Sequence, residues 1–449
     1  MLFIPYFTLL MCIVVYELQR KKVSYIDFLT IFNAFFSLFY VIPGILVSVW
    51  PEFYLRDISS KAAELTQNNV VVFIVVVCAY LLFLIPYLFV RKNIFYNGIP
   101  TVKTYTDPSY QKKIILFSVV MITIATILFT ITIVSRGGLS QAIAIAGLLR
   151  SDKDSVMDKG FMSYLLYVYP YMFRASLILL TYAILVYPQM RLVKILLWGI
   201  SFAMAILAGL VMGGRLNVLY PFVLVFITVV FAKQKIPWLI MTVFCLSSLF
   251  IIYFEKGLSN FFGQEQSLHL DIGNAIYSIS SNRGNAFFSI TREFCYMLYP
   301  IGSSISDMNP SEYQFFKTLL YSPLCILPSS IFNFNMPESV TYLSTFKVLG
   351  VTNIAITYPG IIAYGFFNLS WIGFILVMVL WGSILGYVDR IYNQYKKNCA
   401  FISLIYILLL IILGLSPFWG NPYAAARSLA IYVMICTFIL LFRRLFYLK

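Results

Sequence analysis

VVVFIVVVCAYLLFLIPYLFV, residues Val70 to Val90, decides the fold class of this chain of 449 residues. The stretch has 21 residues, and none of them is charged. An α-helix rises about 1.5 Å per residue, so a helix of this length covers the roughly 30 Å of hydrocarbon in a lipid bilayer. A helix also pairs its backbone polar groups internally, as lipid requires. The stretch therefore predicts a transmembrane helix.

The whole chain has the same character. Hydrophobic residues make up 61% of it and charged residues 11%, and its mean hydropathy is +0.88. Soluble domains contain about 45–50% apolar and about 25% charged residues. A water-soluble globular enzyme is therefore excluded, and we expect an all-α, polytopic integral membrane protein with a single membrane domain over residues 1–449.

Eleven apolar segments are long enough to cross a bilayer. They lie near residues 2–18, 26–50, 70–90, 114–134, 161–187, 195–212, 216–231, 236–253, 361–388, 401–415 and 424–442. We also consider a twelfth, re-entrant piece near residues 319–331. The first segment lacks a basic start and a small-residue cleavage site, so we expect a retained helix and not a signal peptide.

The basic residues behind the net charge of +15 lie mostly in alternate connections between these segments. Alternate connections and the C-terminus carry 18 basic residues against four acidic ones, and an excess of Lys and Arg marks cytoplasmic connections. The pattern predicts an odd number of spans, with the N-terminus in the periplasm and the C-terminus in the cytoplasm. We expect these charges to set orientation and nothing more, so nucleic acid is excluded as a partner.

Two long connections lie on the predicted outer face, at residues 135–160 and 254–360. A loop as long as the second is usually functional. From Phe287 onward its apolar residues recur at helical spacing, which predicts helices at the membrane interface. The longest cytoplasmic connection, residues 91–113, has 23 residues and no phosphate-binding glycine loop. We therefore expect the chemistry outside, without an ATP-driven step.

Arginine dominates the basic residues of the predicted outer face. Eight of its 14 basic residues are Arg, against six of 18 on the cytoplasmic side. Arginine binds phosphate and carboxylate groups through paired hydrogen bonds and is less strongly hydrated than lysine. The bias predicts an outer site for an anion. The eight are Arg56, Arg136, Arg150, Arg174, Arg215, Arg283, Arg292 and Arg427.

Two of these arginines are distinguished by position. Arg174 lies about thirteen residues into its span, roughly 20 Å deep, where an ionisable side chain is usually functional; pairing with a buried structural partner is the alternative. Arg215 follows Gly213 and Gly214 at the tip of a hairpin between two short spans, and glycine permits close approach of a ligand or of backbone. Together they predict an anion site at the outer membrane boundary.

Candidates for acid–base chemistry are fewer. His269 is the only histidine, and Asp271 is placed to orient it as a general base; an incidental loop histidine is the alternative. No His/Cys cluster has the spacing of metal ligands. Of seven cysteines, Cys295 and Cys325 share the long loop, where they either pair or remain free, buried thiols.

Three stretches resemble the Wzy-type oligosaccharide repeat-unit polymerases, which include the O-antigen polymerases. They are Gly213-Gly214-Arg215; Leu327-Pro328-Ser329-Ser330-Ile331-Phe332; and Thr357-Tyr358-Pro359-Gly360, which leads through Ala363-Tyr364 and Phe367-Asn368-Leu369 to Trp371-Ile372-Gly373. The layout, with one large outer loop and no cytoplasmic domain, is similar over most of the chain. Many relatives carry an acidic residue where Ala363 stands here.

The resemblance implies a GT-C-like glycosyltransferase of the bacterial inner membrane. It implies transfer of a glycan from one undecaprenyl diphosphate to a second lipid-linked repeat unit on the periplasmic side, in O-antigen or capsule biosynthesis. It implies neither a cofactor nor a metal, because the donor already carries its activation. The implied partners are the lipid-linked donor and acceptor, membrane lipid and a chain-length regulator protein.

We therefore expect two sets of site residues. The catalytic set, which stabilises the leaving diphosphate and deprotonates the acceptor, is Arg215, Arg283, Arg292 and His269. The substrate-binding set is Arg136, Arg174, Arg427, Tyr358 and Asn368. The alternative functions are an O-antigen ligase, which shares the donor, and a flippase or other transporter of lipid-linked oligosaccharide, which usually shows repeated halves and broken helices.

Overall fold

The structure, a computed structural model, describes most of the chain. The described ranges are 2–22, 24–55, 58–67, 70–92, 108–143, 161–187, 189–212, 215–235, 294–306, 308–326, 337–351, 357–395 and 400–423, with residues 242, 246, 291, 425–426, 428–429 and 433. Within these ranges every regular element is a helix and no strand occurs. The predicted all-α class is therefore confirmed for the described part of the chain.

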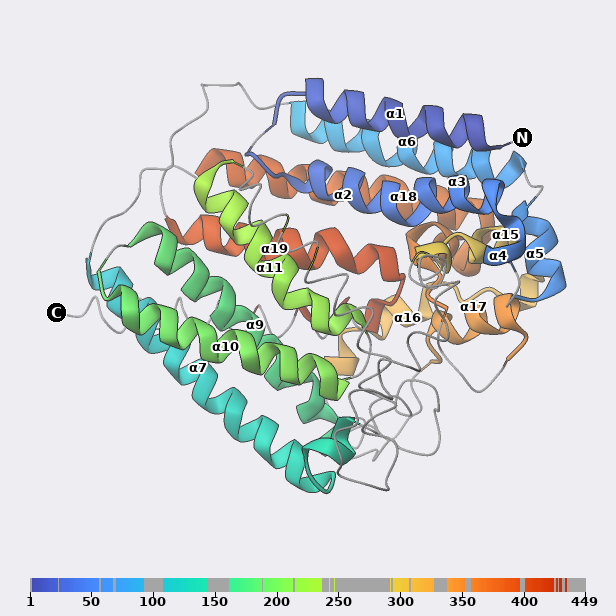
Figure 1. Cartoon of the computed structure of the whole chain (residues 1–449). Coiled ribbons are helices and arrows are strands. Elements are labelled where there is room, and N and C mark those ends of the chain that lie inside the picture. The colour runs from blue at the N-terminus through green and yellow to red at the C-terminus, as the bar shows by residue number, and fades with distance from the viewer. Residues whose placement is uncertain are drawn as a thin grey trace. The chain divides into compact units, whose positions relative to one another are not determined.

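Six helices in the described ranges are long and apolar enough to cross a membrane (Figure 1). They are Phe28–Val49, Val70–Lys92, Ile114–Ser135, Val168–Val186, Arg191–Met212 and Gly360–Gln394, with shorter apolar helices at Phe3–Gln19, Asn217–Lys233 and Ile405–Gly414. Each coincides with a predicted segment. The remaining two predicted segments, near 236–253 and 424–442, lie almost wholly outside the described residues.

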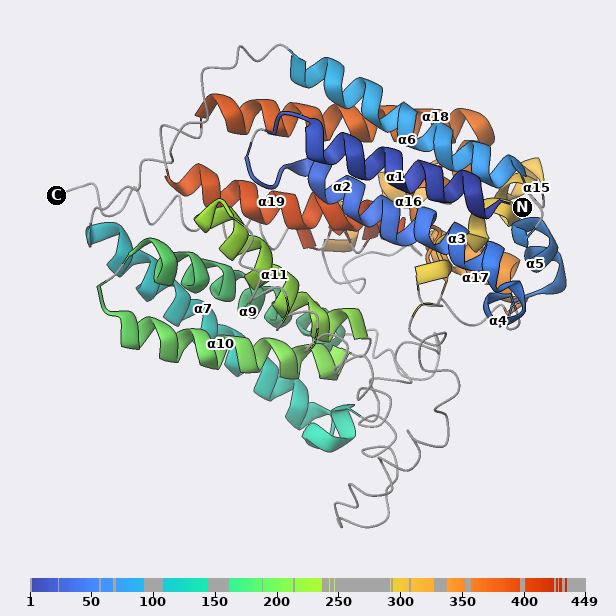
Figure 2. The same cartoon turned by 45° about the horizontal axis from the view of Figure 1, so that its top comes forward.

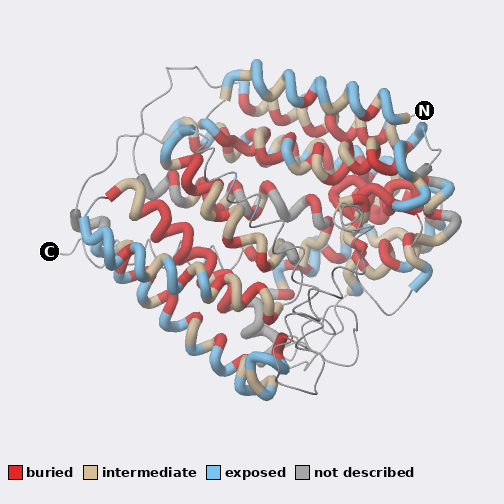
Figure 3. The backbone as a smooth tube through the Cα atoms, viewed as in Figure 1, coloured by how far each residue is buried: buried red, intermediate tan, exposed pale blue. Residues whose placement is uncertain are grey.

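The outward faces of these helices are apolar. Exposed residues recur along α1 (Phe3–Gln19) and α7 (Pro108–Ser135) (Figure 3). Leu18 is 79% exposed and Phe89 77% exposed, values that would be costly for large apolar side chains in water. Such surfaces suit contact with lipid chains, so the chain is a helical membrane protein.

The chain forms two compact units, each assembled from three separate stretches. The first contains Met1–Val102, Phe287–Cys325 and Phe334–Ala426, and the second contains Lys103–Ala286, Ile326–Asn333 and Arg427–Lys449. Figures 1 and 2 show their helices. Unit 1 holds α1, α2 (Phe28–Phe36), α3 (Ile42–Val49), α6 (Val70–Lys92), α18 (Gly360–Tyr395) and α19 (Ala400–Trp419). Unit 2 holds α7, α9 (Phe161–Val186), α10 (Arg191–Met212) and α11 (Arg215–Lys233).

Two glycines bring α18 against the backbone of α6 in unit 1. A Cβ atom on Gly382 would collide with the carbonyl oxygen of Phe83, and one on Gly386 would lie 2.6 Å from the carbonyl oxygen of Tyr87. Glycines four residues apart form a flat strip on a helix, and such strips are the usual close contact between helices in lipid. The α6–α18 pair is therefore packed backbone to backbone.

The predicted continuous span over residues 361–388 is broken inside α18. Leu369 and Ser370 have non-helical backbone angles, and Ser370 has a positive φ of 52°. The break lies between Gly365 and Gly373, where a Cβ atom on Gly365 would lie 2.6 Å from the Cα atom of Phe374. The two glycines of the Gly365–Gly373 stretch thus let the chain fold closely upon itself at the break.

Buried ion pairs join the ends of three helices in unit 1. Arg20 donates hydrogen bonds to Glu17 at 2.7 Å and to Asp27 at 2.7 Å, and Arg91 lies 3.6 Å from Asp27. Asp27 also caps α2 through a capping box with Thr30. Burial alone would raise the pKa of Asp27, but the hydrogen bond and charge of Arg20 and the charge of Arg91 lower it to about 2.

The expectation that the cytoplasmic charges only set orientation is therefore wrong for this group. The predicted cytoplasmic set includes Arg20 and Arg91 among its basic residues and Glu17 and Asp27 among its acidic ones. These four residues pair with one another in the protein interior. A second buried carboxylate, Asp389 of α18, accepts hydrogen bonds from tyrosine hydroxyls of α6 and α19. Removal of one partner from a buried ion pair is costly because it leaves the other charge unpaired. These contacts therefore fix how the helices meet.

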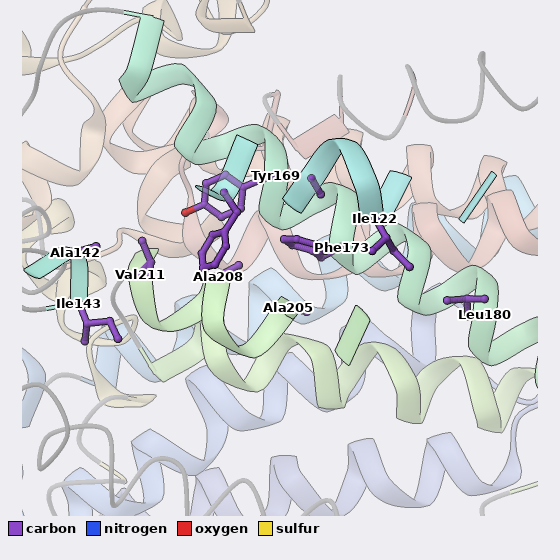
Figure 4. Packing of buried hydrophobic residues seen from close by; sticks show 11 residues of the cluster. Ile122, Ala142, Ile143, Tyr169, Phe173, Leu180, Ala205, Ala208 and Val211 are labelled. Atoms are coloured by element: carbon purple, nitrogen blue, oxygen red, sulfur yellow. The ribbon is translucent and has the colours of Figure 1, made fainter. Parts of the chain in front are cut away.

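The core of unit 2 is formed by α7, α9 and α10. Tyr169 and Phe173 of α9 lie beside Ala205 and Ala208 of α10 (Figure 4). The ring of Phe129 on α7 lies 5.2 Å from that of Tyr169. At the other end of α9, the buried Lys194 ammonium donates to the carbonyl oxygens of Ala183, at 3.0 Å, and of Tyr187. Lys194 thus satisfies carbonyls left unpaired at a helix C-terminus.

The described parts of the long loop pack as ordered structure in unit 1. They include α15 (Tyr299–Ser306), α16 (Lys317–Leu320) and α17 (Val340–Leu349), and Lys347 pairs with Glu312 at 2.9 Å. Of the stretch predicted to lie at the membrane interface, Met297 and Leu298 are buried in the protein. Cys295 and Cys325 are buried thiols that form no disulfide with each other.

The glycine contact between α6 and α18 predicts a stability effect. Gly382→Leu would force its side chain into the Phe83 carbonyl, and overpacking of this kind costs about 1–3 kcal/mol. We expect a lower midpoint of thermal unfolding for the detergent-solubilised protein, measured by loss of the monodisperse peak in fluorescence-detected size-exclusion chromatography.

Gly199→Leu is the matched control, because no atom lies within 4 Å of a Cβ placed at Gly199. Its midpoint should equal or exceed that of the wild type, since leucine favours helix more than glycine. An equal loss in both variants would contradict the packing described for α18.

Candidate anion-binding site

Arg174 lies at the middle of α9, thirteen residues after Phe161 and twelve before Val186. The predicted depth of roughly 20 Å from the helix end therefore holds for the helix itself. The side chain is inside the protein, with 2% of the residue exposed. A guanidinium at this position cannot extend to water along its own side chain, so its partners decide what it does.

The partner of Arg174 is Asn217 in the first turn of α11. The Arg174 Nη2 atom lies 3.3 Å from the Asn217 side-chain oxygen and 3.4 Å from the Asn217 carbonyl oxygen. That carbonyl is available because residue 221, which would donate to it within the helix, is Pro221 and has no N–H. Both distances exceed the 2.7–3.2 Å of a well-formed bond. The guanidinium is thus held loosely.

Two tyrosine rings complete the surroundings of the guanidinium. Its central carbon lies 4.5 Å from the ring centroid of Tyr220 and 5.3 Å from that of Tyr171. Rings at these distances attract a cation by their π faces. The buried Nε–H of Arg174 has no hydrogen-bond partner among the described residues. One donor of a fully buried cation is therefore left over, which is costly unless a further group binds it.

The surrounding unit supplies no counter-charge in its described part. The described residues of unit 2 include nine basic residues and no acidic one. The nine are Lys112, Lys113, Arg136, Arg174, Arg191, Lys194, Arg215, Lys233 and Lys235. Unit 1, in contrast, pairs Arg20, Arg91 and Lys347 with carboxylates. Arg174 has no carboxylate partner in the part of the unit that the structure describes, and such a buried cation suits an anion as its ligand.

The N-terminus of α11 adds positive potential at the same place. Arg215 begins the helix two residues before Asn217, and the first turn of a helix carries unpaired N–H groups and a partial positive charge. A Cβ atom on Gly209 of α10 would lie 2.7 Å from the Asn217 carbonyl oxygen, so glycine allows α10 and α11 to approach here. The structure thus places Arg174 beside the turn that Arg215 opens; the Arg215 side chain lies outside the described part.

Arg136 and the neighbour of Arg427 lie close to this site. Arg136 follows α7 directly, and both it and Arg174 act electrostatically on Tyr169. Arg427 itself is outside the described residues, but the hydroxyl of the next residue, Ser428, donates to the Tyr171 hydroxyl at 2.6 Å. Two members of the predicted substrate-binding set, Arg136 and Arg174, therefore lie in one region of unit 2, and the place of Arg427 stays a prediction.

The other predicted residues have different locations. His269, Arg283 and Arg292 lie outside the described residues, so their roles stay predictions. Tyr358 is half-buried in unit 1, just before α18. Asn368, also in unit 1, is fully buried and uses its amide to accept from the backbone N–H of residue 316, at 2.6 Å, and to donate to the carbonyl of residue 364, at 2.7 Å. These bonds are structural, and direct contact of Asn368 with substrate stays a prediction.

Three residues of the site, Asn217, Tyr171 and Tyr220, are not predicted from the sequence. A signal for Asn217 exists, because proline four residues after any helical residue frees the carbonyl of that residue. The spacing of Tyr171 and Arg174 also places them on one face of a helix. Nothing in the sequence shows that α11 lies against that face.

No protein-family model, curated protein or solved structure matches the chain. The site must therefore be interpreted from its own chemistry. Within the described ranges, no group of three or more His, Cys, Asp or Glu side chains gathers as metal ligands do. A guanidinium beside a helix N-terminus is a combination that suits a phosphate or diphosphate group.

A diphosphate should stabilise the protein through Arg174. At a pyrophosphate concentration 100 times its dissociation constant, binding stabilises the folded state by about 2.7 kcal/mol. We expect pyrophosphate to raise the midpoint of thermal unfolding of the wild type but not that of Arg174→Met, measured by scanning fluorimetry in detergent. Arg191→Met removes an exposed arginine of α10 and should retain the shift. Equal shifts in all three proteins would place the anion elsewhere.

Proposed function

We propose that the protein polymerises oligosaccharide repeat units carried on undecaprenyl diphosphate, at the outer face of the bacterial inner membrane. The observation that supports this most is the buried guanidinium of Arg174, which lies beside the N-terminal turn of α11 and has no carboxylate partner among the described residues. A lipid diphosphate suits such a position below the membrane surface, because its polyprenyl chain anchors it in the bilayer.

The reaction needs stabilisation of a leaving diphosphate. The acceptor hydroxyl attacks the anomeric carbon of the donor glycan; the new C–O bond forms as the C–O bond to the diphosphate breaks. The electron pair of the broken bond stays on the diphosphate, and the hydroxyl proton passes to a base. Fixed arginines aimed at the developing charge lower the barrier without a metal. We assign stabilisation of the leaving diphosphate to Arg174 and Arg215. We assign binding of the substrate to Arg136 and Arg427, and His269 is the proposed base.

The proposed arrangement in the membrane follows from the connections. With eleven spans and the N-terminus in the periplasm, the tip of the α10–α11 hairpin faces the periplasm and the site lies on the periplasmic side of the membrane. The two cytoplasmic connections next to it, which carry Arg191, Lys194, Lys233 and Lys235, are short and basic. We also propose a GT-C-like architecture for the membrane domain, a chain-length regulator as partner and a product that is O-antigen or capsule.

A second candidate is a transporter of lipid-linked oligosaccharide, and one observation favours it. The helix α18 is broken at Leu369 and Ser370, and broken helices commonly line the substrate sites of transporters. The break here is bonded to the backbone of residues 314–316, which satisfies the freed carbonyls and leaves less need for a ligand. We therefore rank polymerisation first.

Gel electrophoresis of lipopolysaccharide separates these functions. Deletion of the gene should leave core carrying a single repeat unit if the protein is a polymerase, whereas complete loss of repeat units from the core would indicate a ligase or a flippase. Complementation with Arg215→Lys keeps the charge but loses the paired hydrogen bonds, so it should shorten or abolish the ladder. Arg191→Lys, on an exposed residue of α10, should restore it fully. A full-length ladder from Arg215→Lys, at equal protein in the membrane, would refute the role assigned to Arg215.

A further inference from the structure

The segment Phe315–Tyr321 of the long loop exposes large apolar side chains. Phe315 is 53% exposed, Leu319 51% and Leu320 72%. Thr318, in the middle, is fully buried and its hydroxyl lies 3.2 Å from that of Tyr364. The segment therefore has one face fixed to the protein and one apolar face directed away from it.

The protein holds this segment in a strained conformation. Phe315 and Phe316 both have positive φ angles, 48° and 54°. Bulky residues rarely adopt this region, and they persist in it only where surrounding contacts enforce it. The enforcing contacts are hydrogen bonds of the backbone: the N–H groups of Gln314, Phe315 and Phe316 all donate to acceptors at the break in α18.

Those hydrogen bonds place the segment beside residues 367 and 368 of α18, at the break in that helix. Gln314 N–H donates to the carbonyl of Phe367 at 3.1 Å, and Phe315 N–H donates to the carbonyl of Asn368 at 3.2 Å. The next exposed residues of α18 are Trp371, at 48%, and Ile372, at 70%. They begin the apolar stripe that continues with Ile375, Leu376 and Leu380 along this candidate span.

We propose that Phe315–Tyr321 is a re-entrant segment whose exposed apolar face lies among the acyl chains of bilayer lipid. The occupant is lipid because the N–H groups of residues 314–316 join the segment, through hydrogen bonds to Phe367 and Asn368, to the point where the exposed apolar stripe of α18 begins. Its backbone polar groups there are paired with α18, which lipid demands of non-helical chain. The exposed Lys317 has an aliphatic stem long enough to bring its ammonium to the headgroups.

This inference is independent of the proposed function. It assigns a membrane-inserted part to a loop that otherwise lies outside the bilayer, and so fixes the depth at which the break in α18 is held.

Site-specific photo-crosslinking in native membranes tests the proposal. The photoreactive amino acid p-benzoylphenylalanine replaces Leu320 in one variant and Phe315 in a second, so that failure of either to fold leaves the other. Ile372 on the lipid-facing stripe is the positive control, and the exposed Glu338 between α16 and α17 is the negative control. After irradiation and purification, intact-protein mass spectrometry detects phospholipid adducts.

We expect phospholipid adducts at Leu320 and Phe315 in a yield comparable to that at Ile372, with none at Glu338. Adducts between two copies of the chain, or with another protein, would show that the face is a protein interface and would overturn the proposal. Absence of lipid adducts at both positions, when Ile372 gives them, would show that the face lies in water and would also overturn it.

Discussion

A charged group inside a membrane protein needs a counter-charge, because burial removes the water that would otherwise solvate it. The described part of unit 1 meets this need within its own sequence, where Arg20 and Arg91 share Asp27. The described part of unit 2 has no carboxylate to offer Arg174. The same physical constraint thus yields a network of ion pairs in unit 1 and, in unit 2, a buried arginine that favours binding of an anion. The proposed function depends on that arginine.

Backbone geometry positions both features. In unit 1, Gly382 and Gly386 remove the side chains that would hold α18 away from α6, so the helices that carry Asp389 and Arg91 approach closely. In unit 2, Gly209 lets α10 approach α11, and Pro221 leaves the Asn217 carbonyl free for Arg174. Glycine and proline therefore decide where the polar groups of this largely apolar protein meet.

The sequence predicts the elements of this fold better than their contacts. Apolar length is a local property, so Val70–Val90 and eight further segments are found as helices at nearly the predicted positions. The break at Leu369 was missed because its residues remain apolar and the cause, hydrogen bonds from residues 314–316, comes from elsewhere in the chain. Arg174 was predicted from depth alone. Its partner Asn217 was not, since no local pattern shows which helices meet, and Arg20 and Arg91 resembled ordinary orientation signals.

The proposed function requires Arg174 to bind a lipid-borne anion. Native mass spectrometry of the protein, released gently from its own membranes, measures this directly as the mass of what remains bound. We expect a bound polyprenyl diphosphate, free or carrying sugars, on the wild type and its loss from Arg174→Met at equal folded protein. Identical spectra for the two proteins, or a wild type that retains no anionic lipid while Arg174→Met remains folded, would contradict it.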